Sequence, residues 1–230
     1  MEMDKLLLKL THIFPINKFK MMVSSYPEIV FPLETISNKK EAQINFDWFL
    51  SIFDERINIL TTVVNKELDA QWTPDFSITS LHTIDAWLLT HSNTRKVSSR
   101  ERRKQIEKRK INGWSQLTME WDEFLTRETA LRCFDAAIYF GETLRRNSKL
   151  GLKWTFLTSP KSLVDLYLPV LMVPGNDMNL NPNRIIAVIA SKNADYNSTV
   201  IKTERRCEVI AMYNVWSDIF TDSFDENKMY

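Results

Sequence analysis

The stretch LRCFDAAIYFGETLRRNSKLGLKWTFLT, from Leu131 to Thr158, decides how the rest of the chain is interpreted. In its first half, apolar residues recur at spacings of three and four, a period that predicts a helix with one buried side. Residues Asn147–Gly151 supply helix-stop and turn residues. Leu152–Leu157 carries two aromatic side chains and is typical of a strand. The stretch therefore predicts a helix, a short polar turn and a strand.

A second stripe of the predicted helix is polar. Because it lies beside the apolar stripe, the helix is expected to have one buried face and one polar face. Glu142 precedes two arginines at i+3 and i+4, which favours an ion pair and an ionised carboxylate. This carboxylate could hold the fold together or contact a ligand. The members of the polar stripe, all candidate binding residues, are Asp135, Tyr139, Glu142 and Arg146.

Gly141 stands in the middle of this helix, where glycine costs about 1 kcal/mol relative to alanine. A residue without a side chain permits close approach of another backbone. We therefore expect Gly141 to mark a contact between the helix and a second segment of backbone. Trp154, on the following strand, is expected to pack on the helix or on the covered face of a sheet.

Two motifs of this region resemble a loose group of bacterial proteins. One is a Tyr-x-Gly-Glu helix followed, after a turn, by a tryptophan-bearing strand. The other is a Ser-Leu-x-x-Leu-Asp-x-Trp-Leu helix, matched by SITSLHTIDAWLL from Ser77 to Leu89. Some members look like immunity or accessory proteins of toxin and defence systems, so the resemblance implies that kind of function. The residues that match the first motif are Tyr139, Gly141, Glu142, Arg145, Arg146 and Trp154.

The composition is ordinary for a globular protein, with 230 residues, 44% hydrophobic and 26% charged. A net charge of +1 gives no overall field that would favour nucleic acid or a membrane. Seven Trp, 13 Phe and only four Gly favour long helices over an all-β fold. Together with the periodic segments, these features predict an α+β fold, a helix-rich single domain packed around a small antiparallel sheet.

The predicted organisation has an N-terminal arm over residues 1–40 and one α+β domain over residues 41–230. A basic insertion at residues 95–113 interrupts this domain. Within the arm, a short helix is expected over Met1–His12, and Lys18–Lys40, which contains Pro27 and Pro32, is expected to be extended or a short strand. The other expected elements are a long helix over Glu41–Leu68, a helix capped by Ser77, a strand at Val164–Val173, a helix at Asn183–Ser191, a loop at Asn193–Ser198, a last helix over Glu204–Phe220 and a frayed tail from Thr221.

The segment Arg95–Lys110 is the strongest charge feature, with nine basic residues against two glutamates. Ser98 followed by Glu101 is a capping-box pattern, which predicts the start of a helix. Such a segment either forms a solvated face or binds an acidic partner, which could be a protein surface or a phosphate backbone. Its candidate binding residues are Arg100, Arg102, Arg103, Lys104, Lys108 and Arg109.

No motif for catalysis, metal binding or phosphate binding stands in the sequence. The three histidines do not follow a metal-ligand spacing, and Cys133 and Cys207 are far apart. Four scattered glycines cannot supply a phosphate-binding loop. His82 and Asp85 are three apart and could share a helix face, where a surface or capping role is expected. We therefore expect no catalytic residue, no metal site and no cofactor.

The N-terminus is too charged for a signal peptide, and no apolar run approaches the length of a membrane helix. Both cysteines are expected to be buried thiols in a reducing compartment. These features predict a cytoplasmic protein without a membrane partner.

The function favoured by the sequence is a non-enzymatic protein-binding module, an immunity or accessory protein of a bacterial toxin–antitoxin or defence system. Its partner would be a protein with an acidic surface, because such a module needs a charge-complementary patch rather than a reaction centre. Two alternatives stay open. One is a nucleic-acid-associated accessory protein that uses residues 95–110, and the other is an enzyme with a carboxylate site at Asp135 and Glu142.

Overall fold

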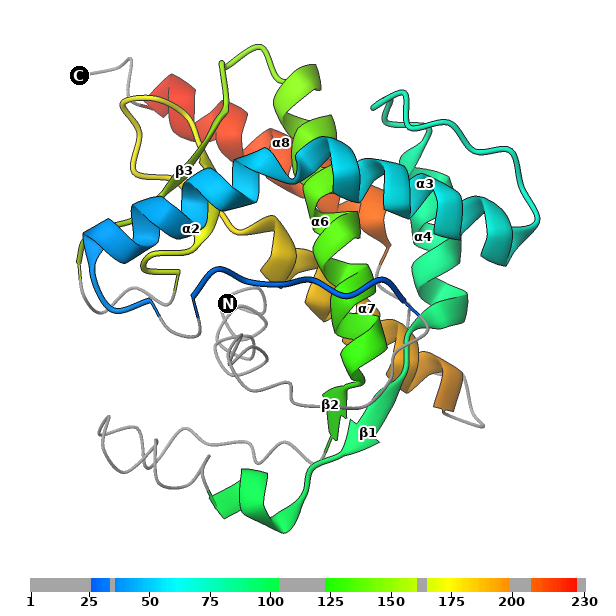
Figure 1. The fold of residues 1–230 in the computed structure, drawn as a ribbon. Helices are drawn as coiled ribbons and strands as arrows, with labels where there is room; N and C mark the ends of the chain where they lie inside the picture. The colour runs from blue at the N-terminus through cyan, green and yellow to red at the C-terminus, as the bar shows by residue number, and fades with distance from the viewer. Residues whose placement is uncertain (1–25, 34–35, 104–122, 161–164, 199–207, 227–230) are drawn as a thin grey trace.

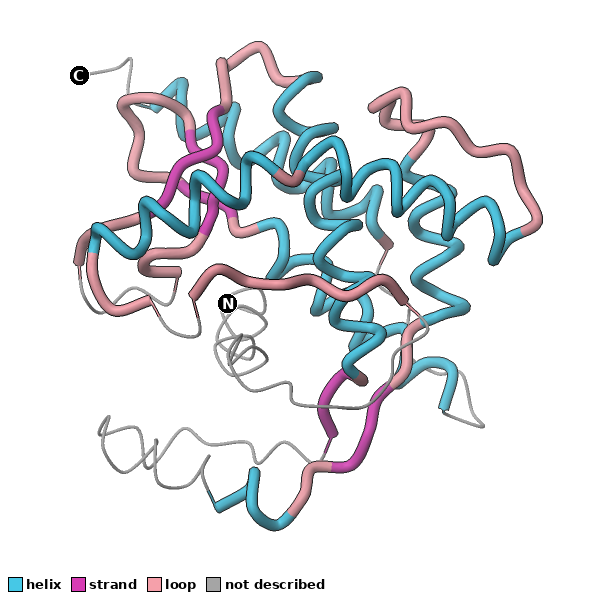
Figure 2. Tube along the Cα trace, in the orientation of Figure 1, coloured by secondary structure: helices cyan, strands magenta, loops and turns pink. Residues whose placement is uncertain are grey.

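The computed structural model describes residues 26–33, 36–103, 123–160, 165–198 and 208–226. Most of these residues are helical, and the strands form two small antiparallel sheets (Figures 1 and 2). The helix-rich α+β class predicted from the sequence is therefore confirmed. The elements in chain order are α2 (Lys39–Ser51), α3 (Phe53–Leu68), α4 (Leu81–His91), β1 (Thr94–Lys96), β2 (Glu123–Leu125), α6 (Arg127–Asn147), β3 (Lys153–Phe156), β4 (Pro169–Met172), β5 (Asn179–Leu180), α7 (Pro182–Ser198) and α8 (Val209–Glu226).

Helix α6 is the central element, because it contacts α3, α4, α7 and α8 (Figure 1). Thr126 caps its first turn by accepting the Thr129 N–H, as expected of a hydroxyl at this position. After the helix, Gly151 adopts a positive φ of 68° in the turn that leads to β3. The predicted order of helix, turn and strand is confirmed.

The long helix predicted over Glu41–Leu68 is instead two helices, α2 and α3, which meet at Ile52. No glycine or proline marks the break, so the periodicity of the sequence runs through it. The break lets Phe49 and Phe53 approach the same indole: their ring centroids lie 5.1 and 5.6 Å from that of Trp154, both edge-on. Packing around this tryptophan therefore accompanies a bend that the helical pattern does not predict.

The three-stranded sheet has the order β3-β4-β5. A proline within a strand favours an edge position or a bulge, but β4, which contains Pro169, is the middle strand. The proline is tolerated because it is the first residue of β4, opposite Phe156, whereas β5 pairs only with Leu171 and Met172. The strand β4 is also shorter than the Val164–Val173 segment predicted from the sequence.

Helices α7 and α8 extend further than the sequence predicted. The expected loop at Asn193–Ser198 is the last part of α7, and the helix α8 continues past the expected end at Phe220. The predicted loop is helical because Asn193 and Ala194 are buried within the helical body. Polar composition alone is therefore a poor guide to where these helices end.

Asp85 has a capping role, which is one of the two roles expected for it. Its carboxylate accepts the Val209 N–H at 3.0 Å and so satisfies a free donor at the start of α8. Ser77, expected to cap its own helix, lies in the turn before α4, where its hydroxyl accepts the Ser80 N–H. Helix α4 accordingly begins at Leu81.

The described part of the N-terminal arm, residues 26–33, runs extended across α6 in Figure 1. The Phe31 ring lies 5.1 Å from the ring of Trp48 and 5.9 Å from that of Phe134, between centroids. Two backbone carbonyls of the arm accept hydrogen bonds from Arg56. The arm therefore packs on α2, α3 and α6, a position that the sequence did not predict.

Candidate functional site

The described part of the basic segment projects from the helical body on the two-stranded ribbon β1–β2 (Figure 1). A short helical stretch, residues 99–103, follows β1. The predicted capping box is confirmed: Glu101 N–H donates to the Ser98 hydroxyl, and the Ser98 N–H donates to the Glu101 carboxylate at 3.0 Å. The ribbon and the cap together fix where this stretch begins.

Arg95 neutralises the single carboxylate of the described stretch. Its guanidinium donates two hydrogen bonds to Glu101, at 2.7 and 3.0 Å, and lies over the Phe124 ring. These hydrogen bonds from Arg95 lower the pKa of Glu101 to about 2, so Glu101 stays ionised and paired. Three other cations of the stretch, Lys96, Arg100 and Arg103, are exposed.

The predicted binding residues of this segment are only partly described. Arg100 and Arg103 are exposed, and Arg102 is half-buried. Lys104, Lys108 and Arg109 lie outside the described residues. The described cations lie on β1 and on the short helical stretch that follows it.

The polar stripe of α6, expected to form a polar face, is buried along most of its length. Asp135 and Tyr139 have no exposed surface, and Glu142 is 5% exposed. Arg146 is exposed. Asp135 is covered by the arm and α3, Tyr139 by residues 72–80 and Glu142 by Trp154 of β3. None of these contacts leaves a local pattern in the sequence of α6.

Asp135 forms a buried ion pair with Arg56 of α3. The guanidinium Nε and Nη2 each donate to one carboxylate oxygen at 2.7 Å, and the side chains are 4% and 0% exposed. The Tyr26 hydroxyl of the arm donates to the same carboxylate at 2.6 Å. Burial raises the pKa of Asp135 to about 6, against the opposing effects of Arg56 and Tyr26. The carboxylate thus joins the arm, α3 and α6.

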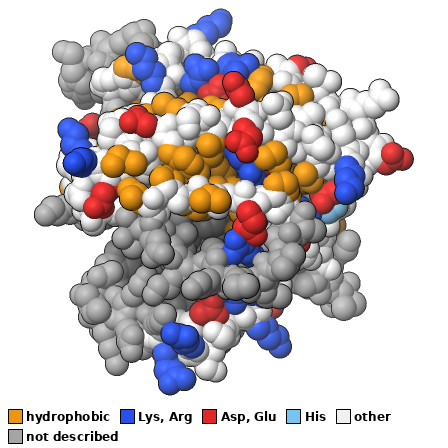
Figure 3. Space-filling view, viewed as in Figure 1, with side chains coloured by type: hydrophobic (Ala, Val, Ile, Leu, Met, Phe, Trp, Pro, Cys, Tyr) orange, Lys and Arg blue, Asp and Glu red, His pale blue; other side chains and the backbone are white. Residues whose placement is uncertain are grey.

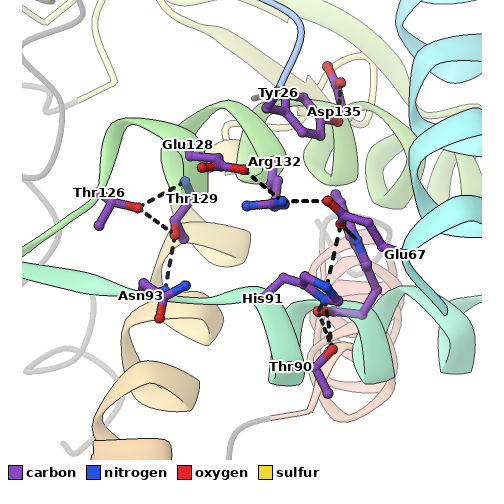
Figure 4. A network of polar contacts seen from close by, with 11 residues as sticks. Tyr26, Glu67, Thr90, His91, Asn93, Thr126, Glu128, Thr129, Arg132 and Asp135 are labelled. Atoms are coloured by element: carbon purple, nitrogen blue, oxygen red, sulfur yellow. Dashed lines mark hydrogen bonds and ion pairs between the residues drawn. The ribbon is translucent and has the colours of Figure 1, made fainter. Parts of the chain in front are cut away.

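A neighbouring cluster is centred on Arg132, one turn away on α6 (Figure 4). Its guanidinium pairs with Glu67 at 2.6 Å and with Glu128 at 2.9 Å. The guanidinium also lies over the rings of Tyr26 and Trp87, with its central carbon 5.4 and 5.8 Å from their centroids. This cluster holds Tyr26 of the arm against the helical body and places two carboxylates beside one guanidinium.

Tyr139 and Glu142 belong to separate networks further along α6. The Tyr139 hydroxyl lies 2.5 Å from that of Ser80 and accepts the Phe76 N–H at 3.1 Å. Glu142 accepts hydrogen bonds from Arg145, Arg146 and the Trp154 indole N–H, at 2.8, 3.1 and 2.7 Å respectively. Burial would raise the pKa of Glu142, but the donors from Arg145 and Trp154 hold it below its usual value. The expected ion pair of Glu142 is confirmed.

The space beside Gly141 is filled by an indole, not by the backbone that we expected. A Cβ atom at this position would lie 2.5 and 2.6 Å from Cζ2 and Cη2 of Trp154, and 3.1 Å from Cγ of Pro182. The glycine therefore makes room for Trp154, which packs on α6 as predicted.

The stability of the arm contact can be tested with Tyr26→Phe. The change keeps the ring over Arg132 but removes a buried donor from Asp135, so the free energy of unfolding is expected to fall by about 1–3 kcal/mol. Urea denaturation measures the difference. The matched control is Tyr213→Phe, at a buried tyrosine whose hydroxyl makes no hydrogen bond within the described residues. Equal stability of both variants would contradict a role for the Tyr26 hydroxyl.

The geometry of these groups suits structural and binding roles better than catalysis. Asp135 and Glu142 lie in different networks. Asp135 accepts hydrogen bonds from Tyr26 and Arg56, and Glu142 accepts them from Arg145, Arg146 and Trp154. Within the described ranges, no three His, Cys, Asp or Glu side chains gather closely enough to hold a metal ion. Cys133 is a buried free thiol, and burial raises its pKa well above the usual value, which leaves it unreactive.

No family model, curated protein or solved structure matches this chain. The resemblance carried by its short motifs therefore stays a prediction. In the part of the chain that the structure describes, no helix is both long and apolar enough to cross a membrane.

The structure also contains a shallow groove that sequence reasoning missed. It has a volume of about 390 Å³ and lies where the end of α2, the start of α3, the end of α6 and β3 meet. No sequence signal pointed to it, since it depends on the break at Ile52. A second depression of about 470 Å³ lies over the 70–83 segment and is lined mainly by hydroxyl-bearing side chains. The residues that line the groove are Leu50, Phe53, Glu142, Arg145, Leu152, Lys153 and Trp154.

Proposed function

We propose that this chain is a non-enzymatic protein-binding module that contacts an acidic partner through its basic segment, residues 95–110. The toxin or defence systems to which its motifs point would supply such a partner. The observation that carries the proposal is the pairing of Arg95 with Glu101. Because Arg95 occupies this carboxylate, the positive charges of the exposed Lys96, Arg100 and Arg103 are not neutralised by Glu101. Exposed cations on a projecting ribbon attract an acidic surface and help to orient it.

The state of the polar residues inside the body supports the same proposal. Asp135 and Glu142, on which an enzyme would depend, are each enclosed by donors from the fold itself. A general acid or base needs a free path to its substrate. The exposed cations of the ribbon, Lys96, Arg100 and Arg103, are not buried in the core, so a partner can reach them.

Charge reversal of the ribbon tests the proposal. The variant replaces Arg100, Arg103 and Lys108 with glutamate. We expect the melting temperature to stay within about 2 °C of the wild-type value, because Arg100 and Arg103 are exposed and the sequence around Lys108 offers few apolar side chains for a core. Binding to the product of the adjacent gene, measured by co-purification and then by calorimetry, should weaken by about 100-fold or more at low salt. Raising the salt concentration should shrink this difference.

A matched control separates this effect from a general change in net charge. It reverses three exposed lysines outside the ribbon, namely Lys39, Lys40 and Lys66. The control should bind as the wild type does. If both reversed proteins bind normally, the ribbon is a solvated face and the proposal fails. Retention of nucleic acid that weakens steeply with salt, without protein binding, would instead identify the nucleic-acid-associated alternative.

A further inference from the structure

We propose that the groove at the α2–α3 break is a second binding surface, which takes an acidic peptide segment of another protein through one apolar side chain. We define the break groove as the depression whose lining residues are Leu50, Phe53, Glu142, Arg145, Leu152, Lys153 and Trp154. This site is separate from the basic ribbon and goes beyond the function proposed above. Its existence depends on how the two helices meet, not on the sequence of the ribbon.

The bend at Ile52 creates the apolar part of the groove. Leu50 at the end of α2 is 42% exposed, although it is a large hydrophobic side chain. Phe53 begins α3 on the other side of the bend and is partly buried. Figure 3 shows apolar side chains interspersed with charged ones across the face on which α2 and α3 lie. The groove therefore offers apolar contact at the surface, where a partner side chain can reach it.

The Trp154 indole gives the groove a rigid wall. Gly141 leaves the space in which the ring lies against α6, and Phe49 and Phe53 meet it edge-on. The indole N–H donates to Glu142 at 2.7 Å. A ring held from three directions needs little ordering when a ligand binds, and an aromatic side chain in such a state is a favourable anchor point.

The charge around the groove selects an acidic ligand. Glu142 is the carboxylate of the lining, and it is already surrounded by Arg145, Arg146 and the Trp154 N–H. An incoming ligand therefore meets positive charge without a free carboxylate from the lining. The two cations of the lining, Arg145 and Lys153, are both at least partly exposed, so they outnumber its single carboxylate.

A peptide fits this combination better than a small molecule does. The groove is shallow, with a volume of about 390 Å³, so it can hold one side chain while the rest of the ligand extends over the surface. An apolar side chain would contact Leu50, Phe53 and Trp154. Flanking Asp or Glu side chains would then reach the cations at the rim, which favours correct orientation and fast association.

Selection from a phage-displayed library of random twelve-residue peptides tests the proposal on the full chain. We expect the enriched sequences to combine an aromatic residue or leucine with neighbouring Asp or Glu. A synthetic copy of the most enriched peptide should then shift the Trp154 indole N–H resonance in a saturable titration. That resonance is assigned by its loss in Trp154→Phe.

Two variants locate the contact. Leu50→Ser combined with Lys153→Glu changes exposed side chains of the groove and should raise the Kd by about tenfold or more. Lys66→Glu, an exposed lysine on α3 away from the groove lining, should bind the peptide slightly more weakly at most. The ribbon variant with Arg100, Arg103 and Lys108 reversed should bind it as the wild type does. This last result keeps the test independent of the proposed function.

Three outcomes would overturn the proposal. One is the absence of an acidic and apolar consensus among the selected peptides. Another is equal binding of the selected peptide to the wild type and to the Leu50→Ser, Lys153→Glu variant. The third is concentration-dependent self-association that this variant abolishes, which would make a second copy of the chain the occupant of the groove.

Discussion

Replacing Asp135 with alanine is expected to lower the free energy of unfolding by about 3–5 kcal/mol, the largest effect of any single change considered. The substitution leaves the Arg56 guanidinium, whose side chain is 4% exposed, without its counter-charge. Chemical denaturation monitored by circular dichroism measures the loss. Asp54→Ala, at an exposed aspartate near the start of α3, is the control and should change stability by less than about 0.5 kcal/mol.

Removing the other partner should produce a loss that depends on pH. In Arg56→Met, the buried Asp135 loses Arg56, which opposes the rise of its pKa more strongly than Tyr26 does, so a pKa that is already about 6 in the wild type rises further. A carboxyl whose pKa is raised by folding stabilises the protein below its unfolded-state pKa, and this contribution disappears as the pH rises through the folded-state pKa. The variant should therefore be closer to wild-type stability at pH 5 than at pH 8.

A double variant separates the cost of an unpaired charge from the value of the pair. Asp135→Leu combined with Arg56→Met removes both charges and should recover a large part of the loss seen in either single variant. If the double variant is as unstable as the sum of the single variants, the two side chains act independently and the buried ion pair is not the source of the effect.

Gly141→Ala is expected to destabilise the protein by about 1–3 kcal/mol, although alanine favours a helix by about 1 kcal/mol over glycine. The new Cβ would lie 2.5 Å from the nearest carbon of Trp154, so the indole has to move. Movement would also break the hydrogen bond between the indole and Glu142. Thermal denaturation measures the stability, and the Trp154 indole N–H resonance reports the displacement.

Two controls define the origin of this loss. Gly151→Ala introduces strain at a positive φ, with no atom within 4 Å of the new Cβ, and should leave the Trp154 resonance in place. In a Trp154→Ala background, Gly141→Ala should cost little, because the clashing ring is gone. A full penalty in that background would show that the glycine serves a contact other than Trp154.

The local elements of this fold could be predicted from sequence because their signals are local. The apolar period of α6, the turn residues before β3 and the Ser98–Glu101 capping box lie within a few residues of the structure they define. The ion pair of Glu142 with Arg145 and Arg146 follows from the same spacing along a helix. Each of these features depends on near neighbours in the chain, which a single sequence displays directly.

The burial of the polar stripe could not be predicted, because its partners are remote. Asp135 looks like a surface residue from its position on the helix, yet the residues that bury it come from the arm and from α3. The break at Ile52 could not be predicted either, because no glycine or proline lies near it in the sequence. The groove that it forms was therefore absent from the sequence-based candidates, whereas the basic ribbon, a composition signal, was among them.

The Tyr26–Asp135 hydrogen bond has a consequence for how the chain folds. It joins residues 109 positions apart, and the Arg56–Asp135 pair joins residues 79 apart. Contacts over such separations form only after a long loop has closed. The conformational entropy lost in closing the loop opposes this step, which slows folding. The α6–β3 unit, whose Glu142–Trp154 hydrogen bond spans 12 residues, can form much earlier. We therefore expect Asp135 to stay hydrated until the arm and α3 pack against α6, so that its desolvation belongs to a late step of folding.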